Sequence, residues 1–466
     1  MMQYVSTRGQ EEELSFQEVL LSGLARDGGL YLPKIWPRLS DDHISSFERL
    51  SYQDIAFHVM KPFTGDAFSD DEFKLMIDRA YSSFNHEAIC PLVKLSKNHF
   101  LLELFHGPTL AFKDVAMQLI GQMFDNVLRK RNIRATIVAA TSGDTGSAAM
   151  AAFEKSDLVD VFILFPKGRV SDVQQRQMTT WGRSNIHALA VEGNFDDCQS
   201  LVKQMFNDHQ FRDTIKLTGV NSINWARIMS QIVYYFTSAV SLGAPKCSIN
   251  FTVPTGNFGD IFAGYVAKKM GLPIDKLVIA SNQNDILHRT LVTGEYRKRG
   301  LKQTISPSMD IQVASNFERL LFELYDGQAH FIKKAMHELA QEGAFKLSLE
   351  ALNIFRDDFL SGTTSEEMTG ETIKKTLNEF GKLVCPHTSV GLAVANGLRT
   401  TNDSVSMITL ATAHPSKFPD SVKACTGVTP NLPERYHDLY SREEVFLSVK
   451  NDFREIKEII AERTSV

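Results

Sequence analysis

The residue with the most distinctive chemistry is a lysine placed among apolar neighbours. Lys113 lies in the sequence LAFKD (residues 110–114), where a helix is expected to begin. An apolar environment and the positive end of a helix dipole both favour the neutral form of the amine. Only the neutral amine attacks an aldehyde to form a Schiff base. Lys113 is therefore a candidate covalent anchor for an aldehyde, and an ordinary solvated lysine is the alternative.

A glycine-containing loop supplies a candidate phosphate site. The sequence TGNFGD (255–260) follows a strand-like segment and precedes a helix expected to end near Gly271. Glycine lets the backbone approach a bound group, and the unpaired N–H groups of a helix N-terminus bind phosphate. The loop has neither the Gly-Lys-Ser/Thr ending of a P-loop nor the G-x-G-x-x-G of a dinucleotide site. A tight turn capped by Asn257 or Asp260 is the alternative explanation.

A second loop of the same kind has the sequence SGDTG (142–146). The hydroxyl and N–H groups of Ser142 and Thr145 could hold a carboxylate or a second phosphate, and helix capping explains them as well. Two loops of this kind favour a ligand with two anionic ends.

Further candidates are weaker individually. Thr412 could bond to a heterocycle nitrogen, or it is an ordinary turn threonine. Lys167, Arg169 and Arg176 give local positive charge, which a solvated helix face explains equally well. His387 lacks a partner at metal-ligand spacing, so we expect it to have a structural role.

These residues belong to a repeated order of strand, loop and helix. Short buried strands that alternate with helices predict a mainly parallel sheet, with ligands beyond the carboxyl ends of the strands. We expect the loops listed above to meet in one crevice, because each leaves a strand at that end. The expected strands are Thr136–Val138, Val161–Phe165, Ile249–Val253 and Val405–Leu410.

The bulk composition limits the class of protein. A chain of 466 residues is expected to form two or three domains. A formal net charge of -5 without long charged runs argues against nucleic-acid or membrane-surface binding. The five cysteines are widely spaced, which favours reduced thiols and gives no metal motif. Without a signal-peptide pattern or an apolar run that could cross a bilayer, we expect a cytoplasmic protein.

Taken in order, the motifs HGPTLAFKD, ATSGDTG, VPTGNFGD, SPSMDI, SNFER and TAHPSKF resemble the threonine synthase family, in its longer bacterial and fungal form. The segment SFQEVLLSGLARDGGLYLP is similar to that family's N-terminal domain, and the resemblance runs from about residue 4 to residue 425. It implies an α/β protein of fold-type II, the tryptophan synthase β-like class, with mainly parallel sheets flanked by helices.

The resemblance also implies a division of the chain and a cofactor. Residues 1–90 would form an extra N-terminal domain, residues 91–430 a core of two lobes, and residues 431–466 a helical C-terminal extension. The smaller lobe would span roughly residues 113–220. The cofactor would be pyridoxal 5'-phosphate (PLP).

Residue by residue, Lys113 matches the family lysine that forms the Schiff base with PLP, and it would also take the Cα proton of the substrate. Thr412 matches the residue beside the pyridine nitrogen. The other matches are Gly256, Asn257, Phe258 and Asp260 for the cofactor phosphate, and the loop with Ser142, Asp144 and Thr145 for the substrate carboxylate. Asn224 lies in a segment, NSIN (221–224), that also resembles the family but has no assigned role there. We expect Asn224, and Lys167 because of its charge, to contact the substrate. Many fold-type II enzymes have Asn where this chain has Asp144.

The implied reaction converts O-phospho-L-homoserine and water to L-threonine and phosphate, by γ-elimination followed by addition of water at Cβ. A phospholyase on the same scaffold, giving 2-oxobutyrate, is the nearest alternative. The long N-terminal domain and SPSMDI argue against an amino-acid dehydratase. A phosphate- or nucleotide-binding module without chemistry is a third possibility, and it would carry no chromophore. Both a monomer and a homodimer remain open.

Overall fold

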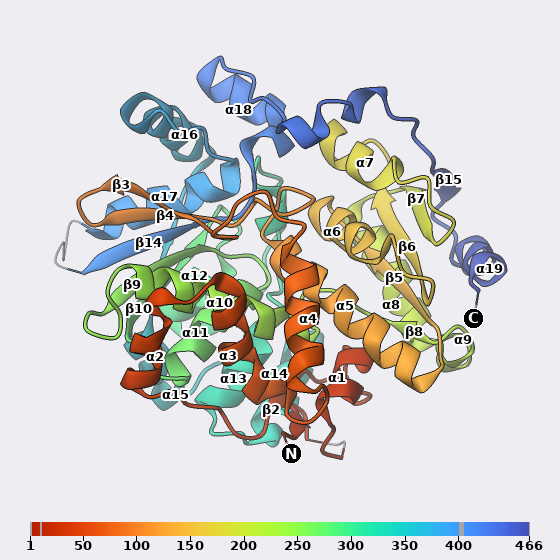
Figure 1. Cartoon of the computed structure of the whole chain (residues 1–466), viewed down its shortest axis with the longest axis horizontal. Helices are drawn as coiled ribbons and strands as arrows, with labels where there is room; N and C mark the ends of the chain where they lie inside the picture. The colour runs from red at the N-terminus through yellow and green to blue at the C-terminus, as the bar shows by residue number, and fades with distance from the viewer. Residues whose placement is uncertain (1, 10–11, 400–404, 466) are drawn as a thin grey trace.

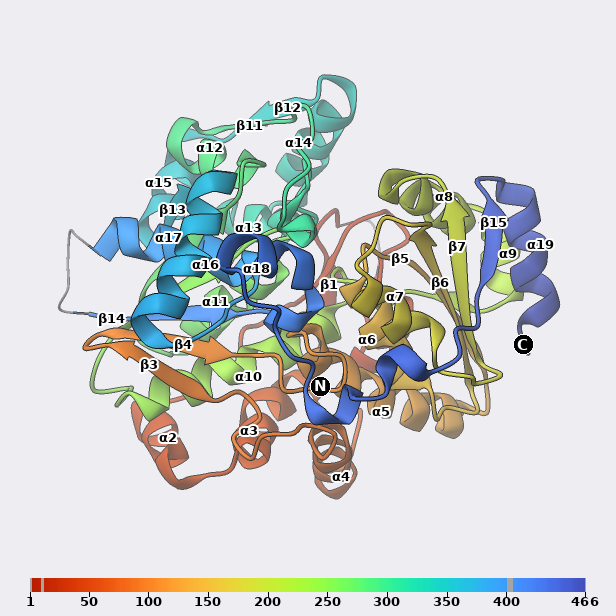
Figure 2. The same ribbon diagram turned by 90° about the horizontal axis from the view of Figure 1, so that it is seen from above.

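Two lobes, one built around a parallel sheet and the other around a mainly parallel one, lie side by side (Figures 1 and 2). The N-terminal helices lie below the lobes in the view of Figure 2. The structure is a computed structural model that describes residues 2–9, 12–399 and 405–465. Both main sheets are flanked by helices, which agrees with the predicted α/β class.

The smaller lobe contains a five-stranded sheet in the order β15-β7-β6-β5-β8, with all neighbouring strands parallel. Its strands are β5 (Ala135–Ala140), β6 (Val159–Pro166), β7 (Ile186–Glu192), β8 (Leu217–Thr218) and β15 (Leu447–Lys450). The helices around it are α5 (Lys113–Arg131), α6 (Asp144–Phe153), α7 (Asp172–Thr179), α8 (Phe195–Asn207), α9 (His209–Thr214) and α19 (Phe453–Arg463).

The larger lobe contains a six-stranded sheet in the order β13-β10-β9-β14-β4-β3, in which only β3 is antiparallel to its neighbour. Its strands are β3 (Leu92–Ser96), β4 (His99–Glu103), β9 (Ile249–Pro254), β10 (Ile274–Ser281), β13 (Phe359–Thr363) and β14 (Ser406–Ala411). A two-stranded antiparallel sheet is formed by β11 (Glu295–Arg297) and β12 (Ala344–Lys346). The helices of the larger lobe are α10 (Trp225–Ser241), α11 (Gly259–Lys269), α12 (Ile286–Thr293), α13 (Phe317–Leu324), α14 (Ala329–Gln341), α15 (Leu349–Asp358), α16 (Glu366–Phe380), α17 (Pro386–Arg399) and α18 (Pro419–Thr426).

The N-terminal part packs against both lobes through α5 and α10. It consists of β1 (Tyr4–Ser6), α1 (Phe16–Ser22), β2 (Tyr31–Pro33), α2 (Asp41–Ser46), α3 (Tyr52–Thr64) and α4 (Asp70–Tyr81). Helix α1 begins at a capping box in which Ser15 and Glu18 satisfy each other's backbone amides. Short 3₁₀ turns occur at Phe47–Arg49, Pro307–Met309, Pro415–Lys417, Glu434–Tyr436 and Leu439–Ser441.

The C-terminal segment differs from the expected helical extension. Strand β15 pairs in parallel with β7, and α19 then covers the same sheet. Val449, Ile456 and Ile460 are buried in one hydrophobic cluster with residues of β5, β6 and β7. A four-residue strand is too short to show a period in the sequence, and its pairing partner lies far away in the chain.

Three of the four predicted loops do meet at the carboxyl ends of their strands. The loops after β5, β9 and β14 line one cavity between the lobes, whereas the loop after β6 does not. The first three belong to strands that end toward the other lobe, so the two sheets contribute to a shared crevice.

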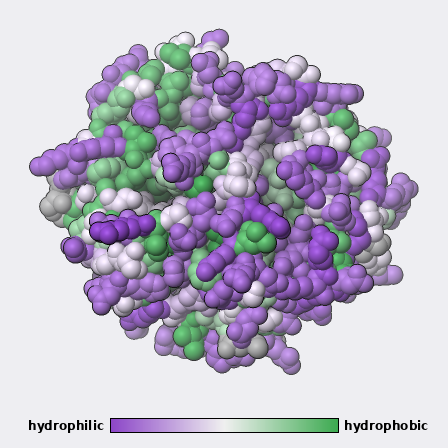
Figure 3. Space-filling model, viewed as in Figure 1, coloured by the Kyte–Doolittle hydropathy of each residue, from purple (hydrophilic) through white to green (hydrophobic). Residues whose placement is uncertain are grey.

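The surface view in Figure 3 shows mainly hydrophilic side chains, with smaller hydrophobic areas between them. Among the described residues, no helix combines the length and the apolar character that crossing a bilayer requires.

Candidate active site

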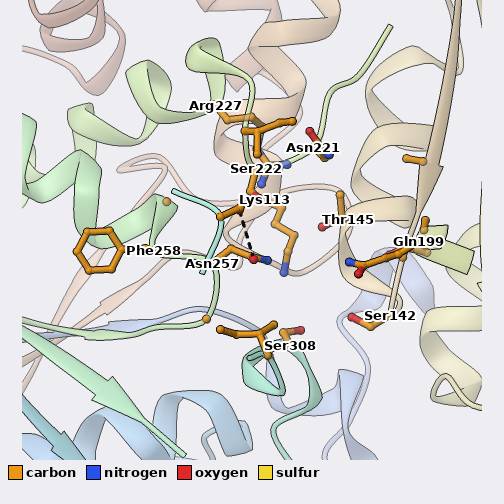
Figure 4. Close-up of a pocket in the computed structure, with 18 of the residues that line it drawn as sticks. Lys113, Ser142, Thr145, Gln199, Asn221, Ser222, Arg227, Asn257, Phe258 and Ser308 are labelled. Atoms are coloured by element: carbon orange, nitrogen blue, oxygen red, sulfur yellow. Dashed lines mark hydrogen bonds between the residues drawn. The ribbon is translucent and has the colours of Figure 1, made fainter. Parts of the chain in front are cut away.

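The cavity between the lobes has a volume of about 660 Å³. Figure 4 shows Lys113 near its centre, with Asn257, Ser222 and Arg227 on the large-lobe side and Ser142, Thr145 and Gln199 on the other side. The predicted residues that line it are Lys113, Ser142, Asp144, Thr145, Gly256, Asn257, Phe258, Asp260 and Thr412.

Lys113 is the first residue of α5, as its neighbours in the sequence predict. It is only 9% exposed, and its ammonium lies 4.7 Å from the ring centroid of Phe112. Burial lowers the pKa of Lys113; Asp144 opposes this effect, whereas the cations Arg227 and Lys417 add to it. The site therefore favours the neutral amine that attack on an aldehyde requires.

Asp144 is the acidic partner of this lysine. Its Oδ2 accepts a hydrogen bond from Lys113 Nζ at 3.3 Å, and its Oδ1 lies 3.1 Å from Lys417 Nζ. Gln174 Nε2 also donates to Oδ1, at 2.8 Å. Burial by itself would raise the pKa of Asp144, but the two lysines hold it well below its ordinary value. Asp144 is therefore a carboxylate with three donors.

The loop before α11 has the geometry of an anion cradle. Phe258 adopts a positive φ of 65°, which turns the chain into the helix, and the first helical bond runs from Phe262 N to Phe258 O. The preceding N–H groups of the turn consequently have no helical acceptor and can bind a phosphate. Gly256 is required here, because a Cβ at this position would lie 2.6 Å from the carbonyl oxygen of Ser308.

The side chains of Phe258 and Asp260 in this loop are not placed to bind an anion. Phe258 turns away from Lys113 in Figure 4 and packs against Phe317. Asp260 Oδ1 accepts hydrogen bonds from Tyr234 and Tyr235, and burial raises the pKa of Asp260 to about 6. Both residues would therefore serve a phosphate through their backbone and not through their side chains.

The loop before α6 is a second such turn. Thr141 Oγ1 accepts from both Gly143 N and Gly146 N at 2.9 Å, which fixes the turn. Gly143 has a φ of 133°, and a Cβ there would lie 2.4 Å from the side chain of Gln174. The remaining first-turn N–H groups of α6, those of Asp144 and Thr145, and the hydroxyls of Ser142 and Thr145 are thereby available to a carboxylate.

Thr412 follows the end of β14 and is 6% exposed. Its carbonyl oxygen accepts from Phe112 N at 2.8 Å, so the backbone ties it to the residue before Lys113. Its hydroxyl makes no hydrogen bond with any residue that the structure describes, and it is free to bond to a ligand atom in the cavity.

Comparison with known proteins agrees with this arrangement. Residues 3–81 match the family "Threonine synthase N terminus", residues 85–351 match "Pyridoxal-phosphate dependent enzyme", and residues 388–460 match "Threonine synthase, C-terminal". Threonine synthase from Pseudomonas aeruginosa is 48% identical over 99% of this chain and 98% of that protein. The chain belongs to the threonine synthase family. The resemblance inferred from the motifs is thereby confirmed.

Solved threonine synthase structures share the whole fold. A PLP-bound threonine synthase from Brucella melitensis matches with a TM-score of 0.97 and 54% identity, covering 100% of both chains. Threonine synthase from Escherichia coli matches with a TM-score of 0.84 and 30% identity, covering 99% of this chain and 100% of that one. The predicted fold-type II class and the predicted cofactor, PLP, are both confirmed.

In this threonine synthase family member, the residues that line the cavity match the chemical groups of PLP. The cofactor needs an amine for its aldehyde, N–H donors for its phosphate and a polar group for its ring nitrogen. Lys113, the turn at 256–261 and the hydroxyl of Thr412, for which the described part of the chain offers no hydrogen-bond partner, supply these three features around one cavity. A further polar atom, Nε of Arg227, is buried beside the cavity without a partner among the described residues.

The sequence analysis did not assign several of the lining residues to the site. His387 Nε2 accepts from Ser308 N at 3.1 Å, so the imidazole is neutral, and burial lowers its pKa to about 4. Arg8 and Lys203 also line the cavity, and both line the neighbouring pocket as well. Lys417 was part of the TAHPSKF motif, but nothing local indicated that it would be fully buried beside Asp144.

Two residues predicted for the substrate are not brought to the cavity. Lys167 is half-exposed and pairs with Glu192 at 3.5 Å, because the loop after β6 faces away. Asn224 is fully buried at the start of α10, where its amide donates to Leu20 O and Gly219 O. The side chain of Asn224 thus fastens the N-terminal part to the core.

The other two basic candidates behave in the same way. Arg176 pairs with Asp172 and Glu444, and neither it nor Arg169 lines the cavity. Of the three basic residues, Arg176 lies on a helix face, in α7, whereas Lys167 and Arg169 lie in the turn between β6 and α7.

Proposed function

We propose that this chain is a PLP-dependent carbon–oxygen lyase that converts O-phospho-L-homoserine and water to L-threonine and phosphate. The observation that supports it most directly is the placement of a buried lysine amine between two helix N-termini in a single cavity. That arrangement suits a cofactor with a phosphate and a substrate with a carboxylate.

Each residue has a role in this reaction. When bound, PLP supplies an aldehyde and a conjugated ring that withdraws electrons from the substrate Cα. Lys113, once its amine is released by the substrate, takes the Cα proton as a general base. The amides before α11 hold the cofactor phosphate, and the amides before α6, with Ser142 and Thr145, orient the substrate carboxylate. Thr412 bonds to the ring nitrogen.

The substrate's own phosphate needs a separate cation. Besides Lys113, the cations that line the cavity are Arg8, Lys203 and Arg227. Arg227 is buried and donates to the carbonyl oxygen of Val220, and Arg8 is paired with Glu318 through two contacts of 3.1 Å. Lys203 has no ion-pair partner among the described residues. We assign the substrate phosphate to Lys203, with Arg8 beside it, in place of Lys167.

The phospholyase alternative uses the same residues and differs only in whether water adds at Cβ before the product leaves. No feature of the cavity favours it over threonine formation. The ratio of threonine to 2-oxobutyrate in the products separates the two reactions.

The test combines trapping and turnover. Borohydride reduction of the holoenzyme followed by peptide mapping is expected to place the reduced cofactor on Lys113, and phosphohomoserine is expected to yield threonine and phosphate in equal amounts. Label on another lysine, or a colourless protein that stays colourless with added PLP, would overturn the proposal. Release of 2-oxobutyrate in place of threonine would establish the phospholyase.

We further propose that the chain divides near residue 90, as predicted above, and that it works in the cytoplasm. The boundary predicted near residue 430 does not separate an independent extension, because β15 and α19 complete the sheet of the smaller lobe. The five free cysteines support a reducing compartment. We expect a small-molecule substrate and no nucleic-acid partner, with a monomer or a homodimer as the working form.

A further inference from the structure

One carboxylate in the cavity is shared by two lysines. Asp144 lies between Lys113 Nζ, at 3.3 Å from Oδ2, and Lys417 Nζ, at 3.1 Å from Oδ1. The three residues come from α5, α6 and the 3₁₀ turn Pro415–Lys417, so both lobes contribute to the group. A single carboxylate can balance only one of these two charges.

The two lysines have different surroundings. Lys417 is fully buried, and its ammonium donates to Thr109 O and Gln177 Oε1 at 2.6 Å each, in addition to the contact with Asp144. These contacts use all three N–H donors of the ammonium. Among the described residues, Lys113 donates only to Asp144, and it otherwise faces Phe112 and the cavity.

Other charged groups also face Lys113. Arg227 on α10 and Lys417 disfavour its ammonium, and Asp144 favours it. Asp260 on α11 and His387 on α17 also interact with it electrostatically. Since His387 accepts a backbone hydrogen bond as a neutral ring, Asp144 is the acidic group in direct contact with Lys113.

We propose that Lys417 is the permanent counter-charge of Asp144, so that Lys113 can give up its proton while Asp144 remains paired. Lys417 is thus a positioning residue that acts on Lys113 through Asp144, without touching the substrate. Removing a partner from a buried ion pair leaves an uncompensated charge, which is strongly unfavourable. Without Lys417, Asp144 would hold the proton on Lys113.

The inference rests on the proposed role of Lys113 but not on the identity of the substrate. It is tested on the full-length chain, stripped of PLP, by trace acetylation with acetic anhydride at a series of pH values. Mass spectrometry of the Lys113 peptide gives the pH at which half of the amine reacts. Neither threonine formation nor bound cofactor enters this measurement.

In Lys417→Met the midpoint for Lys113 is expected to rise by about one pH unit or more, a roughly tenfold loss of labelling near neutral pH. Lys417→Arg is expected to keep the wild-type midpoint. Lys423→Met, a change of an exposed lysine on α18, is the matched control and is expected to have no effect.

A double variant separates charge from structure. With Asp144→Asn in place, the added Lys417→Met change is expected to raise the midpoint of Lys113 by much less, because only the direct repulsion between the two lysines is then lost. An equal rise with and without Asp144, or no rise in Lys417→Met, would overturn the inference. If the stripped Lys417→Met chain does not fold, the holoenzyme is titrated by its visible absorbance, and the Lys113 nitrogen is expected to stay protonated to higher pH. An unchanged titration also counts against the idea.

Discussion

At the scale of single residues, the site is governed by what burial does to charge. Lys113 and His387 are both buried in the cavity wall, and burial disfavours their cationic forms. Asp144 keeps its charge because three donors surround it. Each of these states comes from a small number of contacts, so single substitutions are expected to change them measurably.

Thr412→Asp is expected to change how the reaction partitions. A hydroxyl leaves the ring nitrogen of the cofactor unprotonated, whereas a carboxylate would hold a proton there and keep electron density on the ring. We expect less threonine and more 2-oxobutyrate from the variant, measured by quantifying both products. Thr412→Ser keeps the hydroxyl and serves as control. An unchanged product ratio in Thr412→Asp would count against this role.

Lys203→Gln is expected to weaken binding of the substrate phosphate. Losing one hydrogen bond to a charged group costs about 1.5–3 kcal/mol, so KM for phosphohomoserine is expected to rise by about tenfold or more, with kcat little changed. Lys167→Gln is the control, because Lys167 pairs with Glu192 outside the cavity. A raised KM in Lys167→Gln together with a normal KM in Lys203→Gln would favour Lys167 as the residue that binds the substrate phosphate, as expected from the sequence.

His387 makes stability depend on pH. Its pKa is about 4 in the folded chain, because of burial, and near 6.5 when unfolded. As the pH falls, His387 therefore takes up a proton in the unfolded chain before it does so in the folded chain. The contribution of His387 to the free energy of unfolding is complete above pH 6.5 and falls by about 3 kcal/mol as the pH drops to 4. Urea unfolding at pH 7 and 4.5 is expected to show a smaller loss in His387→Gln than in the wild type. The exposed change His337→Gln is expected to retain the full loss.

At the scale of elements, the site depends on two turns that each lead from a strand into a helix. A helix N-terminus binds an anion only if its amides all face the same space, and that requires a tight approach of the backbone. Gly143 and Gly256 allow the two approaches, since a Cβ at either position would overlap a neighbouring atom.

Gly256→Ala is therefore expected to impair the cofactor site. The added methyl would lie 2.6 Å from Ser308 O, so the turn must shift and its amides with it. The dissociation constant for PLP, measured by absorbance titration, is expected to rise about tenfold or more, which corresponds to about 1.4 kcal/mol. Gly300→Ala, where no atom lies within 4 Å of the new methyl, is the control. Equal affinity of both variants for PLP would contradict the role of the turn at Gly256 in binding the cofactor phosphate.

At the scale of the whole molecule, segments from both ends of the chain complete the lobes. Thr7, near the start of the chain, donates a hydrogen bond from its hydroxyl to Glu318 in α13, and β15 adds a strand to the sheet of the smaller lobe. The smaller lobe therefore cannot be described as a continuous stretch of sequence.

Ile456→Ala is expected to destabilise the smaller lobe. Ile456 is fully buried between α19 and the sheet, and such a truncation typically costs about 2–5 kcal/mol. Val445→Ala, at a residue that is 60% exposed, is the control. Denaturant unfolding should separate the two variants clearly. A cost for Ile456→Ala no larger than that of the control would mean that the tail is not part of this core.

The sequence by itself determined the chemistry and its local setting. The order of strand, loop and helix, the position of Lys113 at a helix start and the two glycine turns are set by residues adjacent in the chain, so local patterns reveal them. The family resemblance added the cofactor and the reaction.

Only the tertiary structure decided which charges meet. Lys417 reaches Asp144, Lys203 faces the cavity and β15 joins β7 through contacts between distant parts of the chain, which periodicity and propensity do not encode. The same packing turned Lys167 toward solvent and used Asn224 as a buried structural amide. A charged or polar side chain looks alike in sequence whether it is solvated or buried, and its burial and partners are fixed only when the chain is folded.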